Sequence, residues 1–195
     1  MDHINLIKEK IQASIDVKTL ILSNTTLLET ISKVADVIVN TYKQNDGKVL
    51  FCGNGGSAAD AQHIAAELSG RFYTDREPLF AEALHVNSSY MTAVANDYSY
   101  DQVYSRMVKA AGRKGDVLIG ISTSGNSANV VKAIEEANKR GMITIGMTGE
   151  KGGKMKDLCK YIINVPSNDT PRIQESHILI GHILCEIVEN KMFSV

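Results

Sequence analysis

The chain has 195 residues, 44% of them hydrophobic and 22% charged, which is the composition of one globular domain with a substantial core. Its formal net charge of -1 offers no broad basic surface, so we expect no nucleic-acid partner. Three cysteines without C-x-x-C spacing favour a reducing cytoplasm over a disulfide framework, and no signal sequence or apolar run of roughly 18 residues predicts a membrane partner.

Two helices are predicted before the first strand. Apolar residues with helical spacing predict the first helix between residues 4 and 22, with one buried stripe. Thr26 followed by Glu29 matches a capping box, which predicts a second helix with Thr26 as its N-cap and an end near 45–47. Their inner faces suit another subunit as well as their own sheet, so residues 1–45 are interpreted as an extension that packs in an oligomer. The two stripes fall at Ile4, Ile7, Ile11 and Ile15, and at Leu28, Ile31, Val34, Ile38 and Tyr42.

The rest of the chain alternates strands with helices. This alternation predicts βαβ units, a mostly parallel sheet and helices on both of its faces. No internal repeat or linker divides the chain, so one domain is expected over residues 1–195. Strands are predicted at 48–52, 83–86, 117–121, 143–147 and 161–165. Helical segments are predicted at 57–67, 88–96, 102–111, 128–140, around 154–159, and at 172–192.

Two polar loops follow predicted strands, at the edge where parallel sheets bind ligands. We call residues 53–57 (Gly-Asn-Gly-Gly-Ser) the glycine turn and residues 122–127 (Ser-Thr-Ser-Gly-Asn-Ser) the serine loop. The glycine turn formally satisfies the G-x-G-x-x-A dinucleotide fingerprint, but the next strand ends without the acidic residue that binds a ribose. Neither loop carries the lysine of a phosphate-binding P-loop. Dinucleotide and nucleoside triphosphate ligands are therefore disfavoured.

The serine loop is the better candidate for an anion. Its four hydroxyls, together with backbone N–H groups at the start of a helix, can hold a phosphate without a cationic side chain. The alternative is that these residues only cap the helix and form turns. A cap requires one such residue, so the sequence favours a phosphate site. The hydroxyls belong to Ser122, Thr123, Ser124 and Ser127.

Four residues on two predicted helices have the spacing of a shared site. His63 and Glu67 lie four apart on one helix face, and Gln174 and His182 lie eight apart on one side of the terminal helix. If the helices meet, two imidazoles, a carboxylate and an amide converge, which suits a divalent metal, zinc above all, or acid–base work. The alternative is an ordinary surface pair of the i,i+4 kind.

Several motifs together resemble the sugar isomerase (SIS) domain family. The resemblance implies a three-layer α/β sandwich around a central five-stranded flavodoxin-like sheet, four subunits, and active sites at subunit boundaries. It also implies an aldose–ketose isomerase that converts sedoheptulose 7-phosphate to D-glycero-D-manno-heptose 7-phosphate, the first step toward ADP- or GDP-heptose. The motifs are the glycine turn, Ala95-Asn96-Asp97, Gly120 to Ser127, Thr148-Gly149 with Gly152-Gly153, and Arg172-Ile173-Gln174-Glu175.

The resemblance assigns roles to individual positions. Glu67 and His182 are the implied catalytic residues, acting through an enediol as a carbon base and an oxygen acid. The implied ligands of one zinc ion are His63, Glu67, Gln174 and His182. The implied substrate contacts are Asn54, Gly55, Gly56, Glu67, Asn96, Asp97, Ser122, Thr123, Ser124, Ser127 and Gln174.

One departure from the family pattern leaves a second function open. Several members have His-Cys after the serine of the glycine turn, whereas this chain has Ala58-Ala59. The alanine version also occurs in a non-catalytic branch that binds the bacterial replication initiator protein, so a binding module for that or another protein is the alternative. Members of that branch lack the glutamate and the terminal-helix histidine. Both Glu67 and His182 are present here, which favours the enzyme.

Overall fold

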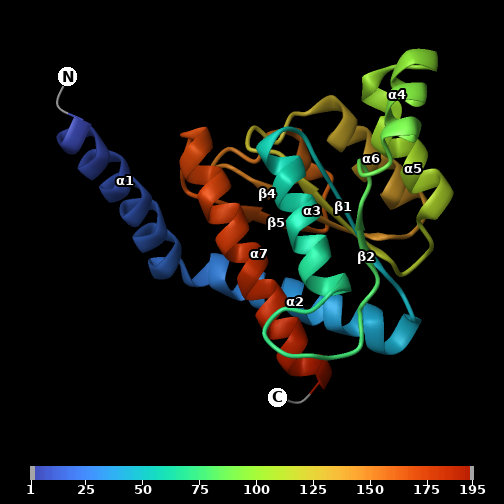
Figure 1. Ribbon diagram of the computed structural model, residues 1–195, viewed down its shortest axis with the longest axis horizontal. Coiled ribbons are helices and arrows are strands. Elements are labelled where there is room, and N and C mark those ends of the chain that lie inside the picture. The colour runs from blue at the N-terminus through green and yellow to red at the C-terminus, as the bar shows by residue number, and fades with distance from the viewer. Residues whose placement is uncertain (1–2, 194–195) are drawn as a thin grey trace.

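The computed structural model describes residues 3–193, and its centre is a sheet of five parallel strands (Figure 1). The order β2-β1-β3-β4-β5 is the flavodoxin-like order, which confirms the predicted fold class. Gly53 at the end of β1 pairs with Ile121 at the end of β3, so the glycine turn and the serine loop leave the sheet side by side. The strands are β1 (Val49–Gly53), β2 (Ala81–Ala83), β3 (Val117–Ile121), β4 (Ile143–Thr148) and β5 (Tyr161–Asn164).

Helices cover both faces of the sheet and give the three layers. Alternate residues of β1 enter different cores: Phe51 packs with the α2, α3 and α7 side, and Leu50 with the α4, α5 and α6 side. Both faces are buried because each crossover of a parallel sheet places a helix over one of them. The helices are α2 (Thr25–Asn45), α3 (Gly56–Ser69), α4 (Ser88–Asp97), α5 (Val103–Ala111), α6 (Ala128–Lys139) and α7 (Thr170–Phe193).

Most predicted elements are found within one or two residues of their predicted bounds, and two differ in a way that has a local cause. The edge strand β2 (Ala81–Ala83) shares only Ala83 with the strand predicted at 83–86, because the chain turns after Ala83 and the Val86 N–H bonds the Ala83 carbonyl. The helical segment before β5 is the 3-10 helix η2 (Gly153–Asp157), and a second 3-10 helix, η1 (Tyr100–Gln102), precedes α5. The strand predicted at 117–121 is confirmed at both ends.

The start of α2 was predicted wrongly. Asn24, not Thr26, is the N-cap, and its Oδ1 accepts a hydrogen bond of 3.0 Å from the backbone N–H of Leu27. An asparagine in front of two threonines offers the same chemistry as the predicted cap. Only the first member of the predicted stripe is wrong, since Leu27 is buried and Leu28 is 40% exposed, whereas Ile31, Val34 and Ile38 are buried as predicted. The predicted end is confirmed by the left-handed conformation of Asp46.

Helix α1 (His3–Ser23) extends away from the body of the molecule (Figure 1). Its predicted apolar stripe is not buried within one chain, since Ile7 and Ile11 are 56% and 58% exposed. The buried residues of α1 are Val17 and Ile21. The stripe therefore faces outward over most of the helix. None of the helices within residues 3–193 has the length and apolar character to cross a membrane.

Candidate active site

The serine loop presents its hydroxyls at the end of β3. Ser122 Oγ lies 2.9 Å from Ser127 Oγ and 3.5 Å from Ser124 Oγ, so three of the four predicted groups gather at one point. Ser127 occupies the N-cap position of α6 but makes no capping hydrogen bond with its side chain. The alternative of a simple helix cap therefore fails for Ser127, and an anion can reach the first turn of α6.

A second glycine-rich segment, residues 149–153, fixes the shape of the serine loop. Gly125 has φ of +66°, and a Cβ placed there would lie 2.1 Å from the carbonyl oxygen of Gly152. Only glycine meets both requirements. Between the two segments lies a cavity of about 280 Å³. It is lined by Thr123, Ser124, Asn126, Gly149, Glu150, Lys151, Asn168, Thr170 and Ile173. Lys151 is the positively charged residue in the cavity lining. Sequence reasoning missed it because the glycines on either side were the most prominent feature of that segment.

The glycine turn is held by an asparagine pair. The Asn54 side chain donates to Asn129 Oδ1 at 2.9 Å and accepts from Asn129 Nδ2 at 2.8 Å, and Tyr100 donates its hydroxyl to Asn54 Oδ1 at 3.1 Å. Asn129 is buried in the first turn of α6, so this pair ties the glycine turn to the serine loop. Sequence reasoning missed Asn129 and Tyr100. The similar composition of the two loops was the signal that could have suggested a contact between them.

His63, Glu67 and His182 converge, and we call them the His–Glu–His cluster. His63 Nε2 lies 3.0 Å from His182 Nε2 and 3.3 Å from Glu67 Oε1. One ligand atom from each of the three lies within 4.8 Å of the others, so the group could hold a metal ion. Two nitrogen ligands at 2.0–2.1 Å on a tetrahedral zinc are about 3.3 Å apart, and the observed separations fit that arrangement.

The cluster exists because α3 and α7 pack against each other. The Cys185 thiol of α7 lies 3.9 Å from the Ile64 carbonyl oxygen of α3, one residue from His63. The surroundings are partly polar and partly aromatic. The ring of Phe72 stacks on His182, with centroids 5.8 Å apart. One turn before His63, Asp60 has a carboxyl oxygen with no hydrogen-bond partner among the described residues, and burial raises its pKa to about 6 although His63 works to lower it.

Three other predicted residues lie apart from the cluster. Gln174 lies against the glycine turn, where a Cβ added to Gly56 would be 2.6 Å from its Nε2. Its distance from His182 is eight residues, about 12 Å along the axis of α7. Asn96 and Asp97 end α4, where the Asn96 amide donates to the Asp97 carboxylate at 3.0 Å and both residues are exposed. The structure thus brings together three of the four predicted metal ligands.

The cluster is displaced from the two loops and open to solvent. His63 stands seven residues from Gly56, about 10 Å along α3, and its side chain is 50% exposed. A larger apolar groove of about 650 Å³ lies elsewhere, between α3 and the edge strand β2. That groove, lined by residues such as Ala65 and Phe80, contains none of the predicted site residues.

Comparisons with known proteins concern the sequence and the fold as a whole. A model of the SIS domain family matches residues 16–149. A phosphoheptose isomerase of Aneurinibacillus thermoaerophilus is 54% identical over 187 residues, which are 96% of this chain and 94% of the relative. One of Clostridium acetobutylicum is 50% identical over 189 residues, 97% and 96% of the two chains. The structure of phosphoheptose isomerase GmhA from Neisseria gonorrhoeae superposes with a TM-score of 0.89 at 44% identity, covering 95% of this chain and 98% of that one.

Proposed function

The chain belongs to the SIS domain family and is a sugar-phosphate isomerase, and on that premise we propose that it interconverts sedoheptulose 7-phosphate and D-glycero-D-manno-heptose 7-phosphate. The observation that carries the proposal is the convergence of His63, Glu67 and His182. Isomerisation moves a proton between adjacent carbons and needs both a base and an acid at one place. The names of the relatives above support the heptose substrate.

Glu67 is proposed as the base that takes and returns the carbon-bound proton, and His182 as the group that protonates and deprotonates the sugar oxygens. The same division of labour operates in triosephosphate isomerase, a worked example of paired acid and base. His63 Nε2 lies within hydrogen-bond range of His182 Nε2 and close to Glu67, so it can fix the orientation of both. The intermediate of this proton transfer is an enediol.

The same residues are the proposed ligands of a zinc ion. His63, Glu67 and His182 supply its donor atoms, and Gln174, which lies apart from them within one chain, is the fourth ligand that the resemblance to the family implies. A bound zinc ion would polarise the carbonyl and hydroxyl of the sugar. Glu67 and His182 cannot be tight metal ligands and free proton carriers at the same moment. Metal removal therefore distinguishes a catalytic from a structural ion.

The two loops at the carboxyl edge are proposed to bind the sugar phosphate. The serine loop takes the phosphate, because its hydroxyls meet at the start of α6 without serving as caps. The glycine turn lets the sugar approach the backbone at Gly55 and Gly56. Asn54 contributes through its backbone, since its side-chain amide is already bonded to Asn129. Asn96, Asp97 and Gln174 complete the proposed substrate contacts.

We also propose that four copies of the chain assemble and that neighbouring copies complete each site. The distance between the cluster and the loops, the half-exposed His63 and the exposed stripe of α1 all support this arrangement. Residues 1–45 then act as the oligomer-forming extension of a single domain. The three free cysteines support a reducing cytoplasm as the place of action.

A direct assay tests the proposal. Purified protein is incubated with sedoheptulose 7-phosphate before and after treatment with a chelator, and again with zinc restored. We expect the heptose phosphate to form, to be lost with the metal and to return with zinc. Turnover that survives complete metal removal would make the ion structural. Absence of turnover under all three conditions would contradict the enzyme and favour a sugar-phosphate-binding module that recruits a protein.

A further inference from the structure

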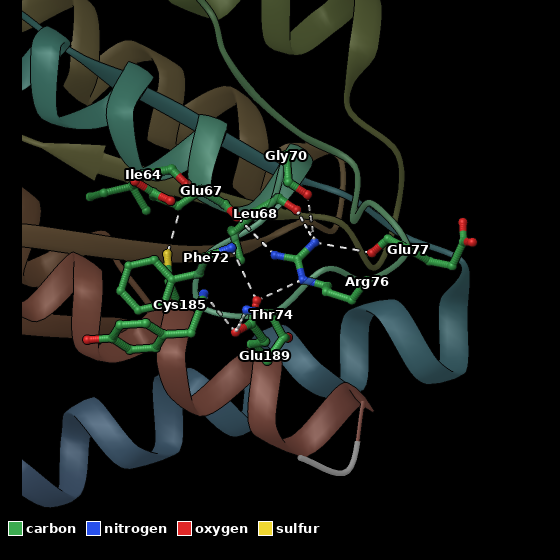
Figure 2. A network of polar contacts seen from close by, with 11 residues as sticks. Ile64, Glu67, Leu68, Gly70, Phe72, Thr74, Arg76, Glu77, Cys185 and Glu189 are labelled. Atoms are coloured by element: carbon green, nitrogen blue, oxygen red, sulfur yellow. Dashed lines mark hydrogen bonds and ion pairs between the residues drawn. The ribbon is translucent and has the colours of Figure 1, made fainter.

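The segment after α3 is tied to α7 by a buried ion pair (Figure 2). Arg76 Nε lies 3.1 Å from Glu189 Oε2, and the two side chains are 3% and 2% exposed. Glu189 also accepts hydrogen bonds from three consecutive backbone N–H groups, those of Phe72, Tyr73 and Thr74, at 3.2, 2.9 and 3.1 Å. One carboxylate thus has four donors, and we call this arrangement the Glu189 anchor.

The charge of Glu189 is stabilised in place. Burial works to raise the pKa of Glu189, but the N–H groups of Phe72, Tyr73 and Thr74 and the guanidinium of Arg76 outweigh burial and hold that pKa below its ordinary value. Four donors directed at one carboxylate leave little freedom to the backbone that carries them. The path of residues 72–74 is therefore set by Glu189.

Arg76 extends the anchor to the end of α3. Its Nη1 donates to the carbonyls of Leu68 and Gly70, and its Nη2 donates to the carbonyl of Glu67 at 2.9 Å. A cation suits this position, because the last carbonyls of a helix have no partner within the helix and carry partial negative charge. The anchor therefore joins the backbone of Glu67 to α7 (Figure 2).

The anchored segment also contacts the second proposed catalytic residue. The Phe72 N–H is bound by Glu189, and the Phe72 ring stacks on the imidazole of His182 at an interplanar angle of 29°. A buried ion pair is weak support for stability, because desolvation offsets much of its attraction. The anchor nevertheless reaches both proposed catalytic residues, because the Phe72 ring contacts His182 and Arg76 bonds the backbone carbonyl of Glu67.

We propose that Glu189, Arg76 and Phe72 are positioning residues, and that the Glu189 anchor holds the Phe72 ring against His182 and thereby sets the orientation of that imidazole for metal binding and proton transfer. The inference rests on the proposed function and adds residues to its site. Phe72 covers one face of the His182 ring, while His63 approaches its Nε2 from α3. Partners that orient a ligand by a hydrogen bond typically change metal affinity by about 10- to 100-fold when they are removed, and a stacked ring is a weaker restraint, so a smaller change is expected here.

The test compares Glu189→Gln and Phe72→Leu with the wild-type protein. In Glu189→Gln an N–H₂ group replaces one carboxylate oxygen and faces the N–H donors that this oxygen accepted from, so residues 72–74 should be released. Phe72→Leu leaves the Glu189 anchor intact and removes only the aromatic ring. Glu77→Gln is the matched control, because Glu77 is exposed in the same loop and offers Arg76 only its backbone carbonyl. Phe72→Tyr is expected to restore the behaviour of the wild type.

Three measurements are made on each variant: zinc affinity by calorimetry without substrate, kcat and KM for the sugar phosphate, and the NMR shift of the His182 Cε1 proton. We expect Phe72→Leu and Glu189→Gln to weaken zinc binding measurably, by up to about 10-fold. They should lower kcat with KM within twofold, and both should lose the ring-current shift that Phe72 imposes on His182. Glu77→Gln should match the wild type in all three.

A wild-type His182 shift in Glu189→Gln would overturn the link between the anchor and the ring. Unchanged zinc affinity and kcat in Phe72→Leu would overturn the positioning role and leave a purely structural anchor. If Glu189→Gln does not fold, Glu189→Asp serves in its place, since it keeps the charge but draws the carboxylate back by one methylene from the N–H groups of residues 72–74. A wild type that turns over no heptose phosphate would contradict the proposed function, while the NMR shifts would still decide the inference.

Discussion

The serine loop and the His–Glu–His cluster are two parts of one proposed site that are built in different ways. The loop is held by contacts of its own backbone and of the glycines at 152 and 153, and its hydroxyls lie within six residues of one another. The cluster depends on two helices whose histidines are 119 residues apart in sequence. The hydroxyls of the proposed phosphate site are therefore neighbours in sequence, whereas the proposed proton-transfer groups come together only through the packing of α3 on α7.

This difference predicts that the two regions can be disrupted independently. Changes in the cluster should remove chemistry and spare substrate binding, because the proposed phosphate site is a separate loop that none of the cluster residues belongs to. Changes in the loop should weaken binding and spare chemistry. A variant that moved both kcat and KM strongly would show that the two regions are coupled more closely than the single chain indicates.

The largest effect is expected for Glu67→Gln. Removal of a general base typically costs 10²- to 10⁴-fold, so we expect kcat to fall by about 1,000-fold. Binding of the sugar phosphate, measured by calorimetry, should stay within a few-fold of the wild type because the serine loop is intact. Turnover close to the wild-type rate would refute the assignment of Glu67 as the base.

The matching change in the loop is the double variant Ser124→Ala with Ser127→Ala. Each lost hydrogen bond to a charged group is worth about 1.5–3 kcal/mol, so the pair should raise KM for the phosphorylated sugar by at least about 100-fold. We expect kcat at saturating substrate to change little. Steady-state kinetics measure the two parameters separately. An unchanged KM would show that the serine loop does not bind the phosphate.

The sequence predicted the local features better than the packed ones. Strand 117–121 and its serine loop follow from one apolar run and the polar residues after it, and the i,i+4 spacing places His63 and Glu67 on one face. The contact of His63 with His182 needed the packing of α3 on α7, which no periodicity contains. The spacing of these residues along each helix could predict the contact only on the condition that the two helices meet.

Errors arose where two residues competed for one role. Asn24 and Thr26 are both good N-caps, and the sequence offers no way to choose between them before the packing of Leu27 is known. The stripe of α1 was predicted from its period, but a period states which residues share a face and not whether one chain has enough surface to cover it. The reciprocal pairing of Asn54 with Asn129 is likewise a tertiary contact.

Acid should destabilise the fold through a buried histidine of the helix that carries His182. His177 is fully buried in α7, with Nε2 3.1 Å from the Thr148 carbonyl oxygen, and burial lowers its pKa to about 4 despite that contact. The unfolded chain takes up this proton below the ordinary pKa of 6.5, and the folded protein does not. The stability from neutral His177 is present above pH 6.5 and is lost as the pH falls toward 4, by about 3 kcal/mol.

Urea unfolding at pH 7, 5.5 and 4.5 measures this loss. The conservative variant His177→Asn keeps a polar group near Thr148 but carries no titrating imidazole, so its stability should fall less steeply over this interval. Other groups contribute to both proteins equally and cancel in the difference. An identical slope in the two proteins would show that His177 does not titrate differently in the folded and unfolded states.

The smallest effect is expected at the link between the two loops. Asn129→Ala removes both hydrogen bonds to the Asn54 side chain and leaves Tyr100 as its remaining partner at 3.1 Å. The glycine turn should then gain freedom, and kcat/KM should fall by about 10-fold, since a neutral hydrogen bond is worth about 0.5–1.5 kcal/mol. Because Asn54 joins neither the cluster nor the phosphate hydroxyls directly, the zinc affinity should not change. Zinc calorimetry together with steady-state kinetics measures both effects. A loss of zinc affinity in Asn129→Ala would mean that the two loops and the His–Glu–His cluster depend on the same contacts, and it would contradict the predicted independence of substrate binding and chemistry.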